Sequence, residues 1–294
     1  MKKRRLKRKA ILEIGGIVIS ISSDDYKLGV EENNAFLIHK SKINPDVKLR
    51  THYRTTIDCH WSETIFEAGN LWSMHRYLGK VIFSFPSQSS GQPLHRVANL
   101  ASDFRTGDIF ITAKETYQNS LLTPLEYPLD ELLIINILSL GRGILVHACG
   151  VGDGEKGYLF AGSSKAGKST VANLWKSKKD VTILSDDRII IRKINGCFWI
   201  YGTPWHGDAK ANSPEKALLN KIFFLKHAKR NIVRKIHPVE ATSRLIICSF
   251  PPFWDKNGME FTLKLCAELV QKIPCYELSF APDESVLDLV QRYK

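Results

Sequence analysis

The sequence predicts an α/β protein in which a β-rich N-terminal domain is followed by a domain of alternating strands and helices. Before residue 126 the clearest patterns are short β-rich runs, such as residues 81–86 and 108–112, bounded by turn-forming residues. After residue 126, helical patterns alternate with short apolar strands, which is typical of an α/β domain. A loop with two glycines, at 162–169, joins one of these strands to the next helix.

Length and charge divide the chain into three segments. Its 294 residues, of which 44% are hydrophobic and 24% charged, are enough for two domains. The first nine residues contain seven Lys or Arg and account for much of the net charge of +12. We therefore predict a basic tail over 1–9, a β-rich domain over 10–126 and an α/β domain over 127–294. A solvated tail is the simplest interpretation, and contact with an acidic partner or nucleic acid is the alternative.

Composition argues against several kinds of partner and setting. No aromatic residue interrupts the basic run, so nucleic acid is not an expected partner. No apolar run approaches the roughly 20 residues that span a bilayer, so a membrane partner is not expected either. The six cysteines are dispersed, without a close pair for zinc or redox chemistry, which favours a reducing, cytoplasmic localisation.

Residues 157–170 fit the phosphate-loop pattern of Gly, four residues, Gly, Lys and Ser or Thr. The fixed positions are occupied by Gly162, Gly167, Lys168 and Ser169. Backbone N–H groups of such a loop point inward at a helix N-terminus, Lys168 reaches the β- and γ-phosphates, and the Ser169 hydroxyl binds Mg²⁺. The pattern predicts ATP and Mg²⁺ as cofactors, and a turn without a ligand is the alternative. The predicted nucleotide-binding residues are Gly162, Ser163, Ser164, Lys165, Ala166, Gly167, Lys168, Ser169 and Thr170.

Residues suited to phosphoryl transfer follow two nearby strands. Asp186 and Asp187 come directly after an apolar strand, where a carboxylate can bind Mg²⁺ or act as a base beside the γ-phosphate. An acidic turn at the strand end is the alternative. His147 lies near the end of the strand predicted at 144–149, where it has either a catalytic or a structural role. We predict Asp187 and Ser169 as metal ligands.

A second polar group is predicted further along the chain. His206, Asp208 and Lys210 alternate with small residues around the turn-forming Gly207. We predict that they contact the substrate, and an exposed polar loop is the competing interpretation.

Residues 131–294 resemble the C-terminal kinase domain of HPr kinase/phosphorylase, whose fold is related to that of ATP-dependent phosphoenolpyruvate carboxykinase. The segments that carry this resemblance are 143–148, 162–169, 185–187 and 201–208. It implies an α/β kinase domain that contains a P-loop. The N-terminal half has no comparable resemblance to the N-terminal domain of that family.

The resemblance also implies a role for each matched residue. Asp186 matches the general base that takes the proton from a serine hydroxyl, and His147 matches the residue that assists or orients this carboxylate. Asp187 would support the base or the metal. With the loop lysine, the implied catalytic residues are Asp186, His147, Lys168 and Asp187.

One departure from the family changes the expected acceptor. A further glycine-rich signature, associated with phosphorylase activity and partner binding, is missing, and residues 202–208 stand in its place. Divergent relatives of this kind include kinases of lasso-peptide precursors. The resemblance therefore implies an ATP- and Mg²⁺-dependent serine kinase acting on a peptide or small protein, with a precursor peptide favoured over HPr. A small-molecule hydroxyl kinase and a non-catalytic ATP-binding regulatory module are the alternatives, and the family's hexamers are consistent with a homo-oligomer.

Overall fold

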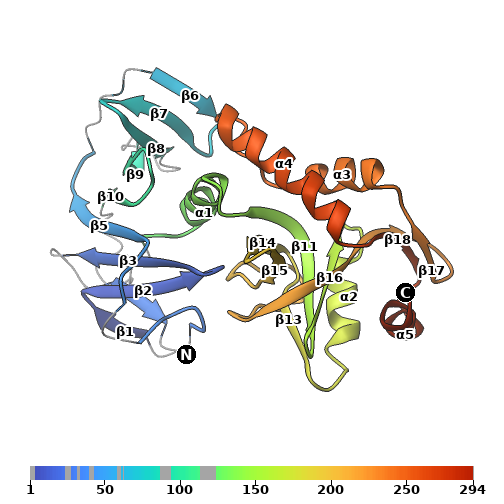
Figure 1. Cartoon of the computed structure of the whole chain (residues 1–294). Coiled ribbons are helices and arrows are strands. Elements are labelled where there is room, and N and C mark those ends of the chain that lie inside the picture. The colour runs from blue at the N-terminus through green and yellow to red at the C-terminus, as the bar shows by residue number, and fades with distance from the viewer. Residues whose placement is uncertain are drawn as a thin grey trace. The chain divides into compact units, whose positions relative to one another are not determined.

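The chain forms a mixed α/β structure with two large sheets, one in each of two compact units (Figure 1). This computed structural model describes residues 4–23, 28–31, 34–39, 43–57, 61, 63–86, 94–112 and 124–293. Unit 1 comprises residues 1–13 and 17–137, and unit 2 comprises residues 14–16 and 138–294. The division falls within helix α1, Leu129–Ser139, whereas the sequence pattern places it at residue 126. Residues 1–3 of the expected basic tail and Cys59 lie outside the described residues.

Unit 1 is built from strands, as its β-rich sequence predicts. Eight of them form one sheet in the order β2-β3-β5-β10-β9-β8-β7-β6, and β1 pairs with β4 in a separate two-stranded sheet. The bounds are β1 Arg4–Lys7, β2 Lys9–Ile14, β3 Ile17–Ser23, β4 Leu28–Glu31, β5 Val47–Arg54, β6 Glu63–Glu67, β7 Ser73–Tyr77, β8 Lys80–Pro86, β9 Leu94–Ala101 and β10 Thr106–Thr112. Most of the expected basic tail thus lies in strands, because backbone pairing with β4 engages the segment.

Strand β5, in the sheet of unit 1, has one apolar side and one polar side. Side chains alternate between the two faces of a strand, so Val47 and Leu49 point to the opposite side from Lys48 and Arg50. Val47 and Leu49 are each 1% exposed, whereas Lys48 and Arg50 are exposed. The apolar side of β5 therefore packs in the core of this unit and its other side is open to solvent.

Unit 2 contains the predicted strand–loop–helix, together with further strands and helices of the predicted α/β pattern. Its strands run in the order β12-β11-β14-β15-β16-β18-β17, with β13 paired to β11 and β12 also paired to β16. The bounds are β11 Ile144–Asp153, β12 Lys156–Ala161, α2 Lys168–Trp175, β13 Val181–Ser185, β14 Arg188–Ile194, β15 Cys197–Tyr201, β16 Lys216–His227, β17 Ile232–Lys235, α3 Pro238–Ile247, α4 Lys256–Lys272, β18 Cys275–Phe280 and α5 Ser285–Arg292. The pairings of β11, β12, β16, β15 and β14 close a ring.

Two hydrophobic clusters hold helices to the strands of unit 2. One contains Leu245 of α3 and Leu269 of α4, and the other contains Trp175 of α2 and Val290 of α5. Strand residues belong to both clusters, so the helices form two layers, α3 with α4 and α2 with α5, as Figure 1 shows. Helix α2, which follows the glycine loop, is thereby anchored in the core. Across the described residues, no helix combines the length and apolarity needed to span a membrane.

Replacing Trp175 by Ala should destabilise unit 2 strongly, because this side chain is 0% exposed and packs against Tyr158 and Phe160 of β12. We expect the free energy of unfolding to fall by about 3–5 kcal/mol. Urea unfolding followed by far-UV circular dichroism measures this loss. In the control variant Phe253→Ala, which removes a side chain that is 69% exposed, the change should stay within about 0.5 kcal/mol. Equal losses in the two variants would contradict the assigned core.

Candidate functional site

The predicted phosphate-loop residues form the connection between β12 and α2. Gly167 caps α2 with a φ of 103°, a left-handed conformation that favours glycine. A Cβ atom there would lie 2.5 Å from a ring carbon of Phe280, and one at Gly162 would lie 2.7 Å from the Cβ of Ala166. The space around the loop therefore favours glycine at both positions, and the backbone conformation also favours it at Gly167.

The remaining loop residues are mostly open to solvent. Ser163, Ser164 and Lys165 are exposed, whereas Ala166 is buried and Thr170 is half-buried. These positions leave the loop backbone accessible at the N-terminus of α2, where N–H groups and the helix dipole favour an anion.

His227 at the end of β16 supports the loop from outside the motif. Its Nε2 atom lies 2.6 Å from the carbonyl oxygen of Lys165, and its ring stacks on Phe280 at a centroid distance of 6.0 Å. No motif in the sequence marks this histidine, because the contact joins segments 62 residues apart.

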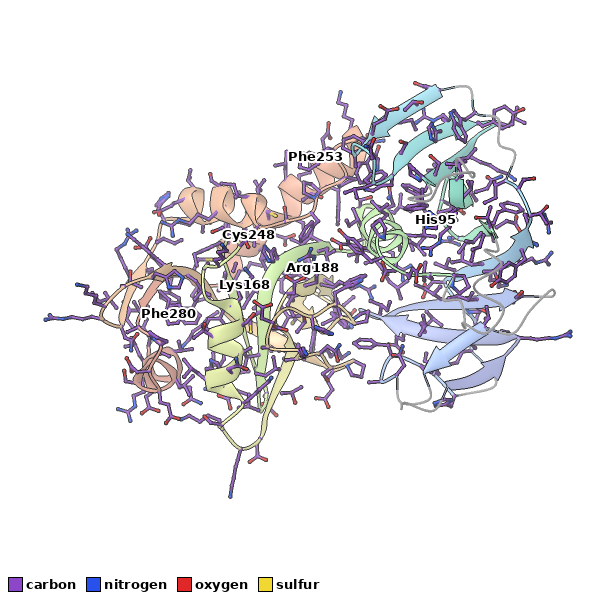
Figure 2. All side chains as sticks on the ribbon, turned by 180° about the vertical axis from the view of Figure 1, so that it is seen from behind. His95, Lys168, Arg188, Cys248, Phe253 and Phe280 are labelled. Atoms are coloured by element: carbon purple, nitrogen blue, oxygen red, sulfur yellow. The ribbon has the colours of Figure 1, made fainter. Side chains whose placement is uncertain are left out.

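Lys168 places its ammonium group inside the loop. The side chain is buried, and Nζ donates hydrogen bonds to the carbonyl oxygens of Gly162 at 3.1 Å and Ser163 at 2.8 Å. Burial lowers the pKa of Lys168, and the negative charge of Asp187 opposes that shift. Figure 2 shows Lys168, Arg188 and Cys248 close together, which agrees with the influence of Arg188 and Cys248 on this lysine. The loop thus carries a cation near the two aspartates.

Asp186 joins the phosphate loop to the segment at 207–211. Its side chain is 1% exposed, and Oδ2 accepts hydrogen bonds from the Ser169 hydroxyl and the Ala209 N–H, both at 2.9 Å. Oδ1 accepts from the N–H groups of Gly207 at 2.9 Å and Ala211 at 3.3 Å. Four donors therefore surround this carboxylate, and three of them are backbone groups whose sequence shows no motif.

The predicted substrate residues lie on the same segment but do not contact Asp186. His206, Asp208 and Lys210 are all exposed, and they alternate with the residues whose N–H groups bind the carboxylate. The structure therefore brings this segment to the site through its backbone and leaves the three side chains in solvent. Their contact with a substrate remains a prediction.

Asp187 contacts His147. The Nε2 atom of His147 lies 3.1 Å from Oδ1 of Asp187, and Nη1 of Arg188 donates to Oδ2 at 2.6 Å. Burial raises the pKa of Asp187, but the hydrogen bond from His147 and the positive charges of Arg188 and Lys168 outweigh it, so the pKa lies below its usual value. The resemblance assigns the histidine contact to the catalytic base, which it matches to Asp186. In the structure that contact is made by Asp187.

Neighbouring backbone and aromatic contacts fix the position of this pair. The His147 N–H donates to the Cys248 carbonyl oxygen at 2.7 Å, and the Arg188 guanidinium lies 4.3 Å from the centre of the Phe250 ring. Both partners come from the segment that follows α3. The histidine and the arginine are therefore held by the same turn, 248–250.

Two buried hydroxyls hold the turn that carries the aspartates. Ser185 donates to the Trp205 carbonyl oxygen at 2.7 Å and accepts from the Asp187 and Arg188 N–H groups, each at 3.1 Å. Thr203 donates to the Arg188 carbonyl oxygen at 2.6 Å. Both residues fall within sequence segments that resemble the HPr-kinase family, although the sequence alone gives neither of them a role.

Cys149 lies close to this site but is buried. Cys149 is 0% exposed and its burial raises its pKa, so it packs as a small apolar residue. In the part of the chain that the structure describes, no group of three or more His, Cys, Asp or Glu side chains is placed to hold a metal ion.

Comparisons with known proteins find similarity among solved structures. No protein-family model matches this sequence, and no curated protein matches it. The chain is similar to the HPr(Ser) kinase/phosphatase from Coxiella burnetii, with 12% sequence identity over 50% of this chain and 90% of that one, at a TM-score of 0.25. At this TM-score the similarity carries no argument about function, which depends instead on the contacts described above.

Adding a methyl group at Gly207 should disrupt the loop that surrounds Asp186. The new Cβ would lie 2.8 Å from Oδ2 of Asp186 and 3.3 Å from the Ser169 hydroxyl oxygen. We expect Gly207→Ala to lower the free energy of unfolding by about 1–3 kcal/mol in urea titrations. The control is Gly152→Ala, where the nearest atom would be at an ordinary 3.4 Å and the loss should be smaller. A Gly207→Ala protein as stable as the wild type would show that the loop does not pack as described.

The stability contributed by Asp187 should depend on pH. Its pKa is depressed in the folded state, so the contribution is fully present above the ordinary value of 3.8 and is lost as pH falls through the lower folded-state pKa. Asp187→Asn should therefore destabilise the protein most at neutral pH, and the difference from wild type should shrink below about pH 4. Urea unfolding at a series of pH values tests this. A difference that grows on acidification would contradict the charge assignment, and Ser177→Ala serves as a non-titrating control.

Proposed function

We propose that this protein is an ATP- and Mg²⁺-dependent kinase that transfers a phosphoryl group to a hydroxyl of a peptide or small protein. The observation that carries the proposal is that two adjacent carboxylates make different contacts. Asp186 binds the phosphate-loop serine at 2.9 Å, and Asp187 pairs with His147 at 3.1 Å. Asp187 is thereby placed next to Asp186, the residue that contacts the loop. In-line phosphoryl transfer to an alcohol requires a base beside the bound phosphate.

The loop residues fit a bound triphosphate with Mg²⁺. Glycines at 162 and 167 allow close packing of the loop, because a Cβ atom there would meet Ala166 or Phe280. Lys168 supplies a buried cation. The Ser169 hydroxyl donates a hydrogen bond to Asp186, so the lone pairs of the Ser169 oxygen are free for a cation. Because Mg²⁺ retains several waters and binds phosphate oxygens, it needs only one or two protein ligands. Ser169 would be one, and the sequence-based prediction of Asp187 as the second is replaced here by a role as the base.

Hydrogen-bond capacity favours Asp187 over Asp186 as the general base. A carboxylate has about four acceptor sites. Asp186 is 1% exposed and accepts four hydrogen bonds, so no site is left for a substrate hydroxyl. Asp187 is 26% exposed and has two partners, His147 and Arg188. We therefore assign proton abstraction to Asp187 and the positioning of Ser169 and the 207–211 segment to Asp186.

The proposed reaction follows from these positions. Asp187 accepts the proton of the acceptor hydroxyl, whose oxygen forms the new bond to phosphorus as the bond to the leaving β-phosphate oxygen breaks. His147 keeps Asp187 oriented, and Lys168 offsets the negative charge of the phosphates. Asp187 is ionised at neutral pH, as an ordinary carboxyl group is, and can therefore accept the proton.

Substitution of Asp187 separates catalysis from nucleotide binding. We expect Asp187→Asn to reduce phosphoryl transfer by about 10²–10⁴-fold, because the base is lost. Intact-mass analysis of a serine-containing peptide incubated with ATP and Mg²⁺ measures product, and isothermal titration calorimetry measures nucleotide affinity. Lys168→Ala should weaken both binding and transfer, whereas Glu260→Gln, at an exposed carboxylate of α4, should change neither.

Three outcomes would count against the proposal. Product formation unchanged by Asp187→Asn would remove Asp187 as the base. ATP binding without product on serine-containing peptides, HPr, free serine or sugars would indicate a nucleotide-binding module instead of a kinase. Product only on free serine or a sugar would support phosphoryl transfer and overturn the peptide acceptor.

A further inference from the structure

A cavity of about 490 Å³, with both polar and apolar residues in its lining, opens on the sheet of unit 1. Its lining residues all belong to unit 1 and come from six neighbouring strands, β2, β3, β5, β10, β9 and β8. Its volume is within the range of sites that bind small molecules or peptide segments. The phosphate loop, Asp186 and Asp187 do not line this cavity.

Strand register gathers polar side chains on this face. Residues that pair across neighbouring strands lie side by side on the same face of a sheet. The paired sets are Ser20–Lys48–Thr106 and Ser22–Arg50–Asp108. At the next strands, Asn99 pairs with Asp108 and Lys80 pairs with Ala101. Polar side chains from neighbouring strands therefore lie side by side on the cavity floor, with Ala101 among them.

The charge of the lining is strongly positive. Lys9, Lys48, Arg50 and Lys80 line the cavity and are exposed. None of these four side chains has a hydrogen-bond or ion-pair partner among the residues that the structure describes. Asp108 is the carboxylate of the described lining, and it lies 2.8 Å from Nε2 of His52. The cations are therefore available to an anionic occupant.

The spacing of the cations suits an extended chain. Lys9 on β2 and Lys80 on β8 are five strand spacings apart in the sheet order, about 24 Å at 4.8 Å per spacing. Roughly seven residues of extended peptide cover this distance, whereas a single phosphate or carboxylate ion reaches only a small part of it. No aromatic side chain lines the cavity, so the surface lacks the stacking positions typical of single-stranded nucleic-acid sites.

We propose that this polar face of unit 1 binds an acidic segment of a peptide or protein in an extended conformation. Asp or Glu side chains of the segment contact Lys9, Lys48, Arg50 and Lys80, and the hydroxyls and amide of the floor bond to its backbone. Binding here requires no nucleotide and no phosphoryl transfer, so it stands apart from the proposed kinase activity. In a peptide kinase, such a site would hold the substrate by a segment distinct from the reacting hydroxyl.

Fluorescence anisotropy with a labelled (Glu-Ser)₄ peptide and the full chain, without nucleotide, tests the proposal. A (Gln-Ser)₄ peptide of the same length is the control ligand. We expect the acidic peptide to bind at least about tenfold tighter at low salt, and its affinity to fall as ionic strength rises. Lys168→Ala should bind it as the wild type does, which separates this site from the kinase proposal.

Paired charge-reversal variants locate the binding. The double variant Lys48→Glu/Arg50→Glu should lose at least about tenfold in affinity, because two attractive contacts become repulsive. Lys229→Glu/Arg230→Glu makes the same charge change at exposed positions of the β16–β17 turn in unit 2 and should stay within about twofold. The proposal would be overturned if the two peptides bound equally well or if the two double variants lost the same affinity. It would also be overturned if a labelled oligothymidylate bound as tightly as the acidic peptide.

Discussion

The carboxylate of Asp186 is the interaction on which the arrangement of the site depends. It is almost completely buried and accepts four hydrogen bonds, one from the phosphate-loop serine and three from backbone groups between Gly207 and Ala211. A buried charge is tolerated only where donors compensate for the lost water, and here the donors come from two separate segments. Satisfying this charge therefore requires the start of α2 and the 207–211 segment to meet at the end of β13.

Adjacent residues take different roles because of where the chain turns. Strand β13 ends at Ser185 and β14 begins at Arg188, so the two aspartates form the connection between them. The Ser185 hydroxyl holds this turn through the N–H groups of Asp187 and Arg188. Asp186 then meets the loop serine, while Asp187 meets the histidine of β11. One short turn thus supplies a structural carboxylate and a partly exposed, ionised one to the same site.

Local patterns account for much of the fold and for the phosphate-loop residues. Periodicity and the positions of glycine and proline predict strand β12, which ends just before Gly162, and helix α2, which begins at Lys168. They also predict the later helices α3, α4 and α5. Lys168, Ser169, Asp186, Asp187 and His147 lie in one unit, and their catalytic and metal-binding roles stay predictions. The sequence pattern was not sufficient at His206, Asp208 and Lys210, whose side chains are exposed. The pattern does not reveal that the backbone of this segment, and not these side chains, contacts Asp186.

By itself the sequence determined the β-rich first half, the strand–loop–helix and the set of residues with suitable chemistry, because these depend on spacing within one segment. Tertiary structure alone decided that His147 pairs with Asp187 and that Gly207, Ala209 and Ala211 bind Asp186. It also decided that cations from β2, β5 and β8 line one face of a sheet. These contacts join residues far apart in the chain, and their partners are set by strand order and register, which no local pattern encodes.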